Sequence, residues 1–143
     1  MNKIHKTAII SDSAIIGSNV TIGPYSIIGD SVRIANNNVI HSSVSISGNT
    51  DIDENNKFFP FCSIGSVPQD LKYRGEKNSI SIGDNNKLRE YVNINPGTSQ
   101  GGTITKIGNN NLLMVYCHIA HDCNLGDNIV LANNVQVGGH VTI

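Results

Sequence analysis

The chain has 143 residues, of which 38% are hydrophobic and 15% are charged, and its formal net charge is −1. This length predicts one domain with one continuous core, and the charge balance excludes the strongly basic surface typical of nucleic-acid-binding proteins. The first residues contain no apolar run long enough for a signal peptide, and no later segment approaches the roughly 20 apolar residues of a membrane span. We therefore expect a cytoplasmic protein that does not insert into a membrane and does not bind nucleic acid.

A large apolar residue recurs at every sixth position over the first 64 residues. These anchors are Ile4, Ile10, Ile16, Ile22, Ile28, Ile34, Ile40, Ile46, Ile52, Phe58 and Ile64. Four positions after most anchors stands a small or β-branched residue, such as Ala8 or Val20, with Asn38 and Asn56 as exceptions. Both columns are expected to face the interior.

A period of six matches neither an amphipathic helix nor a simple alternating strand. It is typical of a coil of three short strands and three turns, about 18 residues long, wound into a triangular prism around stacked aliphatic side chains. Glycines after the anchors, such as Gly17 and Gly23, and asparagines at residues 36–38 are expected at the corners, because both tolerate positive φ angles. The sequence thus predicts an all-β parallel β-helix of hexapeptide repeats, in a single domain spanning residues 1–143.

The period is interrupted twice. Anchors lapse between Ile64 and Ile82, and Ile94 and Ile107 stand 13 positions apart instead of six. We expect two protruding loops at about residues 66–80 and 96–106, each either a tolerated insertion or a binding segment. The anchors then resume as Ile107, Leu113, Ile119, Leu125, Leu131, Val137 and Ile143.

The three cysteines are too few and too scattered for a disulfide framework, and no CxxC pair offers a zinc-ribbon pattern. Cys62, Cys117 and Cys123 each stand four positions after an anchor. They are expected to be free thiols in the core, since thiols are common small core side chains.

The segment HIAHDCN, residues 118–124, places two histidines and a carboxylate on outward positions. His118, His121 and Asp122 are therefore expected to be exposed or at an interface. Gly139 follows His121 by one coil of 18 residues, and His140 follows Asp122 by the same interval. Equivalent positions of adjacent coils lie roughly 4.8 Å apart, so these groups should form one polar strip.

Such a strip could support acyl transfer. An imidazole can remove a hydroxyl proton, a carboxylate can fix the imidazole tautomer, and the N–H of a glycine can stabilise an oxyanion. On spacing alone, ordinary exposed histidines and a metal site remain open alternatives.

Longer motifs carry a specific resemblance. The hexads, together with SIGSVPQDLKYRGE, NLLMVYCHIAHDCNLGDNIVLANN and VGGHVTI, resemble the UDP-N-acetylglucosamine 3-O-acyltransferases of lipid A biosynthesis, a family of hexapeptide-repeat acyltransferases. The resemblance implies a left-handed β-helix and a homotrimer. It further implies transfer of a 3-hydroxyacyl chain from acyl carrier protein to the 3-hydroxyl of UDP-N-acetylglucosamine, without a metal or another cofactor.

The resemblance also implies roles for single residues. In the catalytic group, His121 resembles the general base, Asp122 its orienting carboxylate and Gly139 the oxyanion donor. The substrate-binding residues implied in the same way are Gln69, Asp70, Lys72, His118 and His140.

Two departures from the family pattern affect these expectations. Asn95 and Pro96 stand where the family usually has histidine and arginine, which puts substrate contacts there in question. The family also continues beyond the position of Ile143 with further coils and a helical domain. We therefore expect a truncated or naturally short chain with weak acyl transfer.

Other functions fit parts of the sequence. A related acyltransferase could act on another amino sugar with coenzyme A as donor, and a zinc hydratase could use His118, His121 and His140 as ligands. A non-catalytic trimeric sugar-nucleotide-binding protein is a further alternative. Six of the ten basic residues lie between Lys72 and Lys106, where they could attract an acidic carrier protein or simply be solvated.

Overall fold

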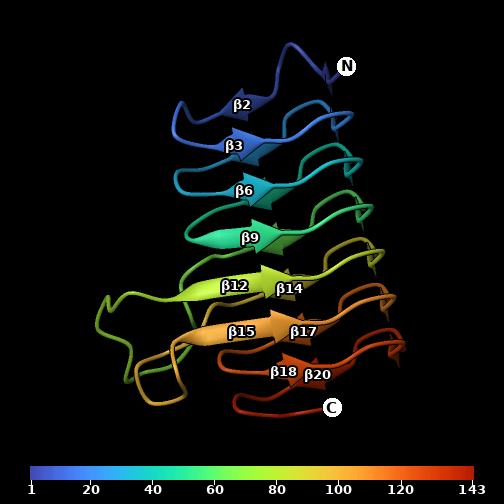
Figure 1. The fold of residues 1–143 in the computed structure, drawn as a ribbon. Coiled ribbons are helices and arrows are strands. Elements are labelled where there is room, and N and C mark those ends of the chain that lie inside the picture. Colours follow the sequence, from blue (N-terminus) through green and yellow to red (C-terminus); the bar gives the residue numbers. More distant parts are fainter.

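The computed structural model describes residues 1–143 as a left-handed parallel β-helix built from twenty short strands, without any helix. No segment therefore forms a helix that is long and apolar enough to cross a membrane. Three strands make one coil, and each strand pairs in parallel with the strands one coil before and after it (Figure 1). The predicted fold class is confirmed.

The strands form three parallel sheets, one for each face of the prism. The first sheet contains β1 (Lys3–Ile4), β4 (Thr21–Ile22), β7 (Val39–Ile40), β10 (Lys57–Phe58), β13 (Lys87–Leu88), β16 (Leu112–Leu113) and β19 (Val130–Leu131). The second contains β2 (Ile9–Ile10), β5 (Ile27–Ile28), β8 (Ser45–Ile46), β11 (Ser63–Ile64), β14 (Asn93–Ile94), β17 (His118–Ile119) and β20 (Gln136–Val137). The third contains β3 (Ile15–Ile16), β6 (Arg33–Ile34), β9 (Thr50–Ile52), β12 (Ser79–Ile82), β15 (Ile104–Ile107) and β18 (Asn124–Leu125).

The anchor residues fill the interior of the prism. Ile34, Ile46, Ile64 and Ile94 are completely buried, as the period predicts. Ile4 is 46% exposed because it belongs to the first coil, which has a neighbour on one side only. Burial of these aliphatic stacks is the main stabilising contribution to the fold.

The cysteines belong to the same interior. Cys62, Cys117 and Cys123 are buried and free, as expected. Burial raises the pKa of the Cys62 thiol to about 12. These thiols are therefore unreactive side chains of the core.

The two asparagines that seemed to break the inward column belong to a buried ladder. Asn38, Asn56, Asn86 and Asn111 stack one above another at one corner of the prism. The side-chain oxygen of each accepts the backbone N–H of the next asparagine in the column, at 2.8, 2.8 and 2.9 Å. Their amide nitrogens donate to corner carbonyls, so no buried amide group in this column is left without a partner.

The expected role was wrong for Gly17 and Gly23, whereas Gly65 does have a positive φ, of 89°. Gly17 and Gly23 have ordinary φ angles, whereas the left-handed corner positions come three residues after most anchors, as at Asn19 and Tyr25. A Cβ at Gly17 or Gly23 would lie 2.7 Å from an atom of the next coil. Close approach of the coils, and not a turn conformation, requires glycine there.

Two segments without strands, residues 65–78 and 95–103, leave the prism between coils. Strand structure returns at Ser79 and Ile104, slightly earlier than the sequence indicated. Figure 1 shows both segments protruding on the same side of the prism. They contact each other, since Asn78 Nδ2 donates to the Gly97 carbonyl at 2.9 Å and the Ser99 N–H donates to Glu76 at 3.0 Å. We call them the first and second loops.

Candidate active site

The polar strip lies at the corner between β17 and β18, where the second sheet passes into the third. The pairing of His118 with Gln136 and of Ile119 with Val137 stacks Gly139 on His121, one coil apart. The His140 N–H donates to the His121 carbonyl at 3.0 Å, which fixes the two corners together. Neighbouring coils thus bring together residues that are 18 positions apart, as the register predicts.

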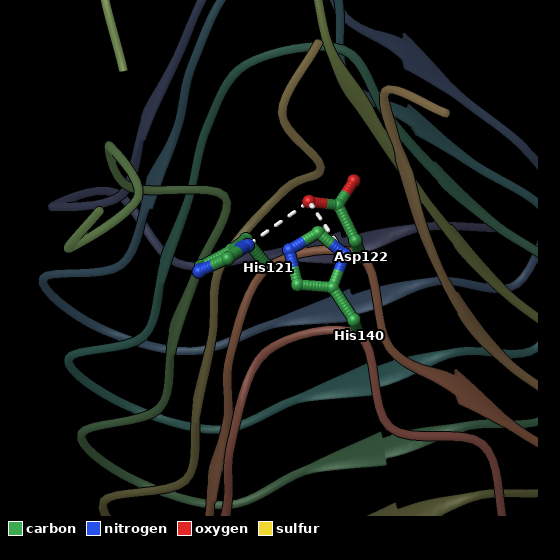
Figure 2. A group of neighbouring side chains, drawn as sticks. All are labelled: His121, Asp122 and His140. Atoms are coloured by element: carbon green, nitrogen blue, oxygen red, sulfur yellow. Dashed lines mark hydrogen bonds and ion pairs between the residues drawn. The ribbon is translucent and has the colours of Figure 1, made fainter. Parts of the chain in front are cut away.

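His121 and Asp122 form the central pair of this strip (Figure 2). His121 Nδ1 lies 2.9 Å from Asp122 Oδ2. Asp122 has a φ of 60°, a left-handed conformation that aspartate tolerates better than most residues, and this corner turns its carboxylate toward the ring. Because an ionised carboxylate only accepts hydrogen bonds, this contact calls for a proton on Nδ1, and in the neutral ring Nε2 then keeps its lone pair.

Asp122 is not exposed, contrary to the expectation from its outward position. Its side chain is only 1% exposed, because the second loop folds over it. The Thr98 N–H donates to Oδ1 at 2.8 Å, and the Thr98 hydroxyl donates to Oδ2 at 2.5 Å. Burial on its own would raise the pKa of Asp122, but these two bonds and the contacts with His121 and His140 hold that pKa below its ordinary value.

His140 completes the group on the outer side. Its Nδ1 lies 3.9 Å from Asp122 Oδ2, and its ring meets the His121 ring edge to face with centroids 4.9 Å apart (Figure 2). Half of its side chain is exposed, against 16% for His121. His140 is therefore the more accessible of the two imidazoles.

Gly139 leaves the space that the His121 ring occupies. A Cβ at this position would lie 2.5 Å from His121 Cε1, closer than real Cβ contacts allow. The Gly139 N–H donates no hydrogen bond within the chain. It is thus an unpaired donor beside the imidazole.

The first loop contributes one group to this site directly. Asp70 Oδ2 lies 3.9 Å from His121 Nε2, on the side of the ring opposite Asp122. Lys72 is exposed and its Nζ reaches Gln100 of the second loop at 3.4 Å. Gln69 is exposed and its side chain makes no hydrogen bond within the chain. The structure therefore brings Asp70 to His121 and leaves Gln69 and Lys72 exposed on the loop surface.

His118 lies on β17, on the outer face of the second sheet. Its Nδ1 is 2.7 Å from Asn93 Oδ1 of the coil before. Partial burial lowers the pKa of His118, and the nearby His121 lowers it further. The neutral imidazole is favoured at this position.

Asn95 and Pro96, which depart from the family pattern, are buried under the first loop. Asn95 Nδ2 donates to the Ser66 carbonyl at 3.2 Å, while its Oδ1 has no partner. Asn95 therefore joins its coil to the start of the first loop.

His121, Asp122 and His140 have potential ligand atoms within 4.8 Å of one another. Both oxygens of Asp122, however, already accept hydrogen bonds from Thr98 or His121. His118, which the zinc alternative requires, lies outside this group and is paired with Asn93. The donor set therefore fits a hydrogen-bonded imidazole–carboxylate pair better than a tetrahedral zinc site.

Sequence reasoning missed the residues that enclose Asp122. Thr98 binds its carboxylate, Thr105 Oγ1 accepts its backbone N–H at 2.9 Å, and Gly101 packs so close that a Cβ would collide with the Asp122 side chain. The coil register gave no signal for Thr98, because strand pairing on this face ends at Ile94 and Thr98 lies in the loop that follows.

Comparison with known proteins supports the assignment of the fold. Residues 13–48 and 104–143 match the family model for the bacterial transferase hexapeptide (six repeats). The structure is similar to that of LpxA from Acinetobacter baumannii, with a TM-score of 0.96 and 53% identity over 97% of this chain and 54% of that chain.

Curated proteins are similar to this chain in sequence over nearly its whole length. An acyl-[acyl-carrier-protein]–UDP-N-acetylglucosamine O-acyltransferase from Aliarcobacter butzleri is 63% identical over 141 residues, and one from Janthinobacterium sp. is 58% identical over 141 residues. Each alignment covers 99% of this chain and 54% of the relative. The chain thus spans about half the length of the curated relatives it matches.

Proposed function

Because the chain belongs to the bacterial transferase hexapeptide family, we propose that it transfers an acyl chain from acyl carrier protein to a hydroxyl of UDP-N-acetylglucosamine. Donor and acceptor are those in the names of its relatives from Aliarcobacter butzleri and Janthinobacterium sp.. The motif resemblance refines the proposal to a 3-hydroxyacyl chain and the sugar 3-hydroxyl, a step of lipid A biosynthesis in the cytoplasm. No metal or other cofactor takes part in the proposed reaction.

The observation that carries this proposal is the His121–Asp122 pair. With Nδ1–H donated to Asp122 at 2.9 Å, the Nε2 of His121 can accept the proton of the sugar hydroxyl. The hydroxyl oxygen then forms a bond to the thioester carbonyl carbon. The Gly139 N–H, which has no partner in the chain, is available to the oxyanion that develops there.

The second half of the reaction restores the imidazole. The carbon–sulfur bond of the thioester breaks as the oxyanion collapses, and the proton on Nε2 passes to the leaving thiolate of the carrier protein. Asp122 stabilises the positive charge that His121 carries between the two proton transfers. The products are the sugar ester and the free carrier thiol, so atoms and electrons balance without a cofactor.

The groups around this pair are suited to holding the sugar nucleotide. Asp70 lies 3.9 Å from Nε2, where it could accept a hydrogen bond from a second sugar hydroxyl. Gln69, Lys72, His118 and His140 are proposed to make the remaining substrate contacts. Lys72 is exposed and can meet a phosphate of the nucleotide.

The proposed assembly is a homotrimer, with the site completed by a second copy. Within one chain no pocket forms around His121; the only hollow, of about 330 Å³, lies between β1 and β4 at the other end of the prism. At the corner between the first and second sheets, Phe61, Tyr91 and Tyr116 stack with ring centroids 5.0 and 4.7 Å apart while remaining about half exposed. An exposed apolar column of this kind supports contact with another subunit.

Turnover by the purified chain tests the proposed function. The assay combines UDP-N-acetylglucosamine with 3-hydroxyacyl carrier protein and, separately, with the acyl-coenzyme A, and compares wild type with His121→Ala. We expect ester formation with the carrier-bound donor by the wild type and none by the variant. Equal turnover by His121→Ala, or binding of the sugar nucleotide without any turnover by wild type, would contradict the proposal.

A further inference from the structure

We infer that Thr98 is a positioning residue for the proposed acyl transfer, because its hydroxyl and backbone N–H together fix the orientation of the Asp122 carboxylate toward His121. This inference rests on the proposed function and concerns the same site. Thr98 lies in the second loop, outside the hexad register, and it is 24 positions before Asp122 in the sequence.

Both oxygens of Asp122 are held at the same time. Thr98 donates its N–H to Oδ1 at 2.8 Å and its hydroxyl to Oδ2 at 2.5 Å, and His121 Nδ1 meets the same Oδ2 at 2.9 Å. Rotation of the carboxylate about its Cβ–Cγ bond would break at least two of these bonds. The carboxylate therefore has one orientation, the one that serves His121.

The loop that carries Thr98 is built around this carboxylate. The Thr98 carbonyl accepts the N–H of Gly101 at 3.1 Å and that of Thr103 at 2.9 Å, which closes a turn over Asp122. Gly101 has no side chain at the point where the turn meets Asp122. Asn78 ties the turn to the first loop through the Gly97 carbonyl at 2.9 Å. Thr98 itself is 1% exposed.

The same contacts explain why a buried carboxylate keeps its charge here. The ionisable groups that face Asp122 are His121 and His140, with Asp70 beyond the His121 ring and the buried Cys123 thiol next in the chain. Burial raises the pKa of Asp122, and the two hydrogen bonds from Thr98 act in the opposite direction. Without the Thr98 hydroxyl, the ionised carboxylate loses one of its three hydrogen-bond donors at a position that water does not reach.

The test compares Thr98→Val, which removes the hydroxyl and keeps the size and the N–H, with Thr98→Ser, which keeps the hydroxyl. Thr103→Val serves as the loop control, because the Thr103 hydroxyl is exposed and bonds only to the neighbouring Gly102 carbonyl. The intact chain is labelled with carboxyl-¹³C aspartate, and the Asp122 carboxyl is titrated by NMR. In parallel, kcat and KM are measured with UDP-N-acetylglucosamine and the acyl carrier protein donor.

We expect the pKa of Asp122 to rise in Thr98→Val and to stay at the wild-type value in Thr98→Ser and Thr103→Val. We also expect kcat to fall about tenfold or more in Thr98→Val with KM little changed, since Thr98 does not touch the substrate. An unchanged Asp122 titration in Thr98→Val, or an unchanged kcat in an otherwise active protein, overturns the inference. A wild-type chain without turnover contradicts the proposed function itself, and with it the catalytic part of this inference, whatever the titration shows.

Discussion

Two carboxylates lie on opposite sides of the His121 ring. The buried Asp122 lies 2.9 Å from Nδ1, whereas Asp70 of the first loop lies 3.9 Å from Nε2. The close contact fixes the tautomer, and the longer one leaves room for a hydroxyl group to approach Nε2. At the scale of residues, this asymmetry is what suits His121 to the proposed role of a base.

Gly139→Ala tests the space that the ring needs. The new methyl group would lie 2.5 Å from His121 Cε1, so the ring must move and its hydrogen bond to Asp122 must lengthen. A displacement of this size is expected to lower kcat by a factor on the order of 100. Gly138→Ala is the matched control, because its Cβ would meet nothing within 4 Å and kcat should stay at the wild-type value.

Asp122→Asn tests the buried charge. The pKa of Asp122 is lower in the folded protein, so its ionisation stabilises the fold above the unfolded value near 3.9, and that stabilisation is lost as the pH falls through the folded value. Urea unfolding at pH 7 and near pH 3 should show a smaller loss of stability on acidification in the variant than in wild type. An identical acid dependence in both proteins would contradict the assignment of this charge.

The same substitution should also affect activity. At neutral pH, the kcat of Asp122→Asn should be lower than that of wild type by roughly 100-fold or more.

At the scale of elements, strands of two residues persist because they repeat in register on both sides. The pairing interval is 18 residues along most of the chain, and it becomes 30 and 25 residues where the first and second loops leave the prism. The asparagine ladder at one corner supplies a polar counterpart to the isoleucine stacks. Each of its amides joins two coils, so the ladder ties the coils before and after the loops together.

Asn86→Ala tests this ladder. The substitution leaves the Asn111 N–H and the Gly108 carbonyl without partners in a buried place, and each such group costs about 1–3 kcal/mol. We expect the free energy of unfolding to fall by about 2–4 kcal/mol in urea titrations. Asn124→Ala, at an exposed position on β18 without a side-chain hydrogen bond, should change it by less than about 0.5 kcal/mol. Equal effects of the two substitutions would rule out the ladder as a stabilising element.

The period of six predicts most of this architecture because it fixes which residues become neighbours one coil apart. For that reason the proximity of His121 to Gly139 and of Asp122 to His140 follows from spacing. The burial of Asp122 under Thr98 does not follow, because the second loop leaves the period and its contacts depend on a turn closed by Gly101. The buried asparagines were also missed, since a single amide looks unfavourable in a core and only the stacked column satisfies it.

At the scale of the whole molecule, one prism leaves its proposed catalytic groups at an open corner, without a pocket around them. The stacked rings of Phe61, Tyr91 and Tyr116 occupy one corner, and Ile9 and Ile27 are exposed on the adjoining second sheet. Apolar surface in this arrangement is unfavourable in water and would be covered in an oligomer. The proposed homotrimer would give His121 the enclosed cleft that one chain lacks.

Tyr91→Glu tests this assembly. A charge in the middle of the aromatic column should weaken association, so light scattering should report a mass closer to one copy than to the three expected for wild type. Turnover should fall together with the measured mass. Lys87→Glu, on the first sheet in the same coil, is the control and should leave the mass unchanged. A wild-type chain that is monomeric and fully active would refute the need for a second copy.

The central claim is that Asp122 fixes His121 as a base with its lone pair on Nε2. Nitrogen-15 NMR of the histidine rings in the intact chain near neutral pH measures this directly, with His121→Gln used for assignment. We predict a protonated Nδ1 and an unprotonated Nε2 for His121, with that preference weakened in Asp122→Asn. A His121 ring that carries its proton on Nε2, or whose tautomer is the same with and without the Asp122 carboxylate, would contradict the account.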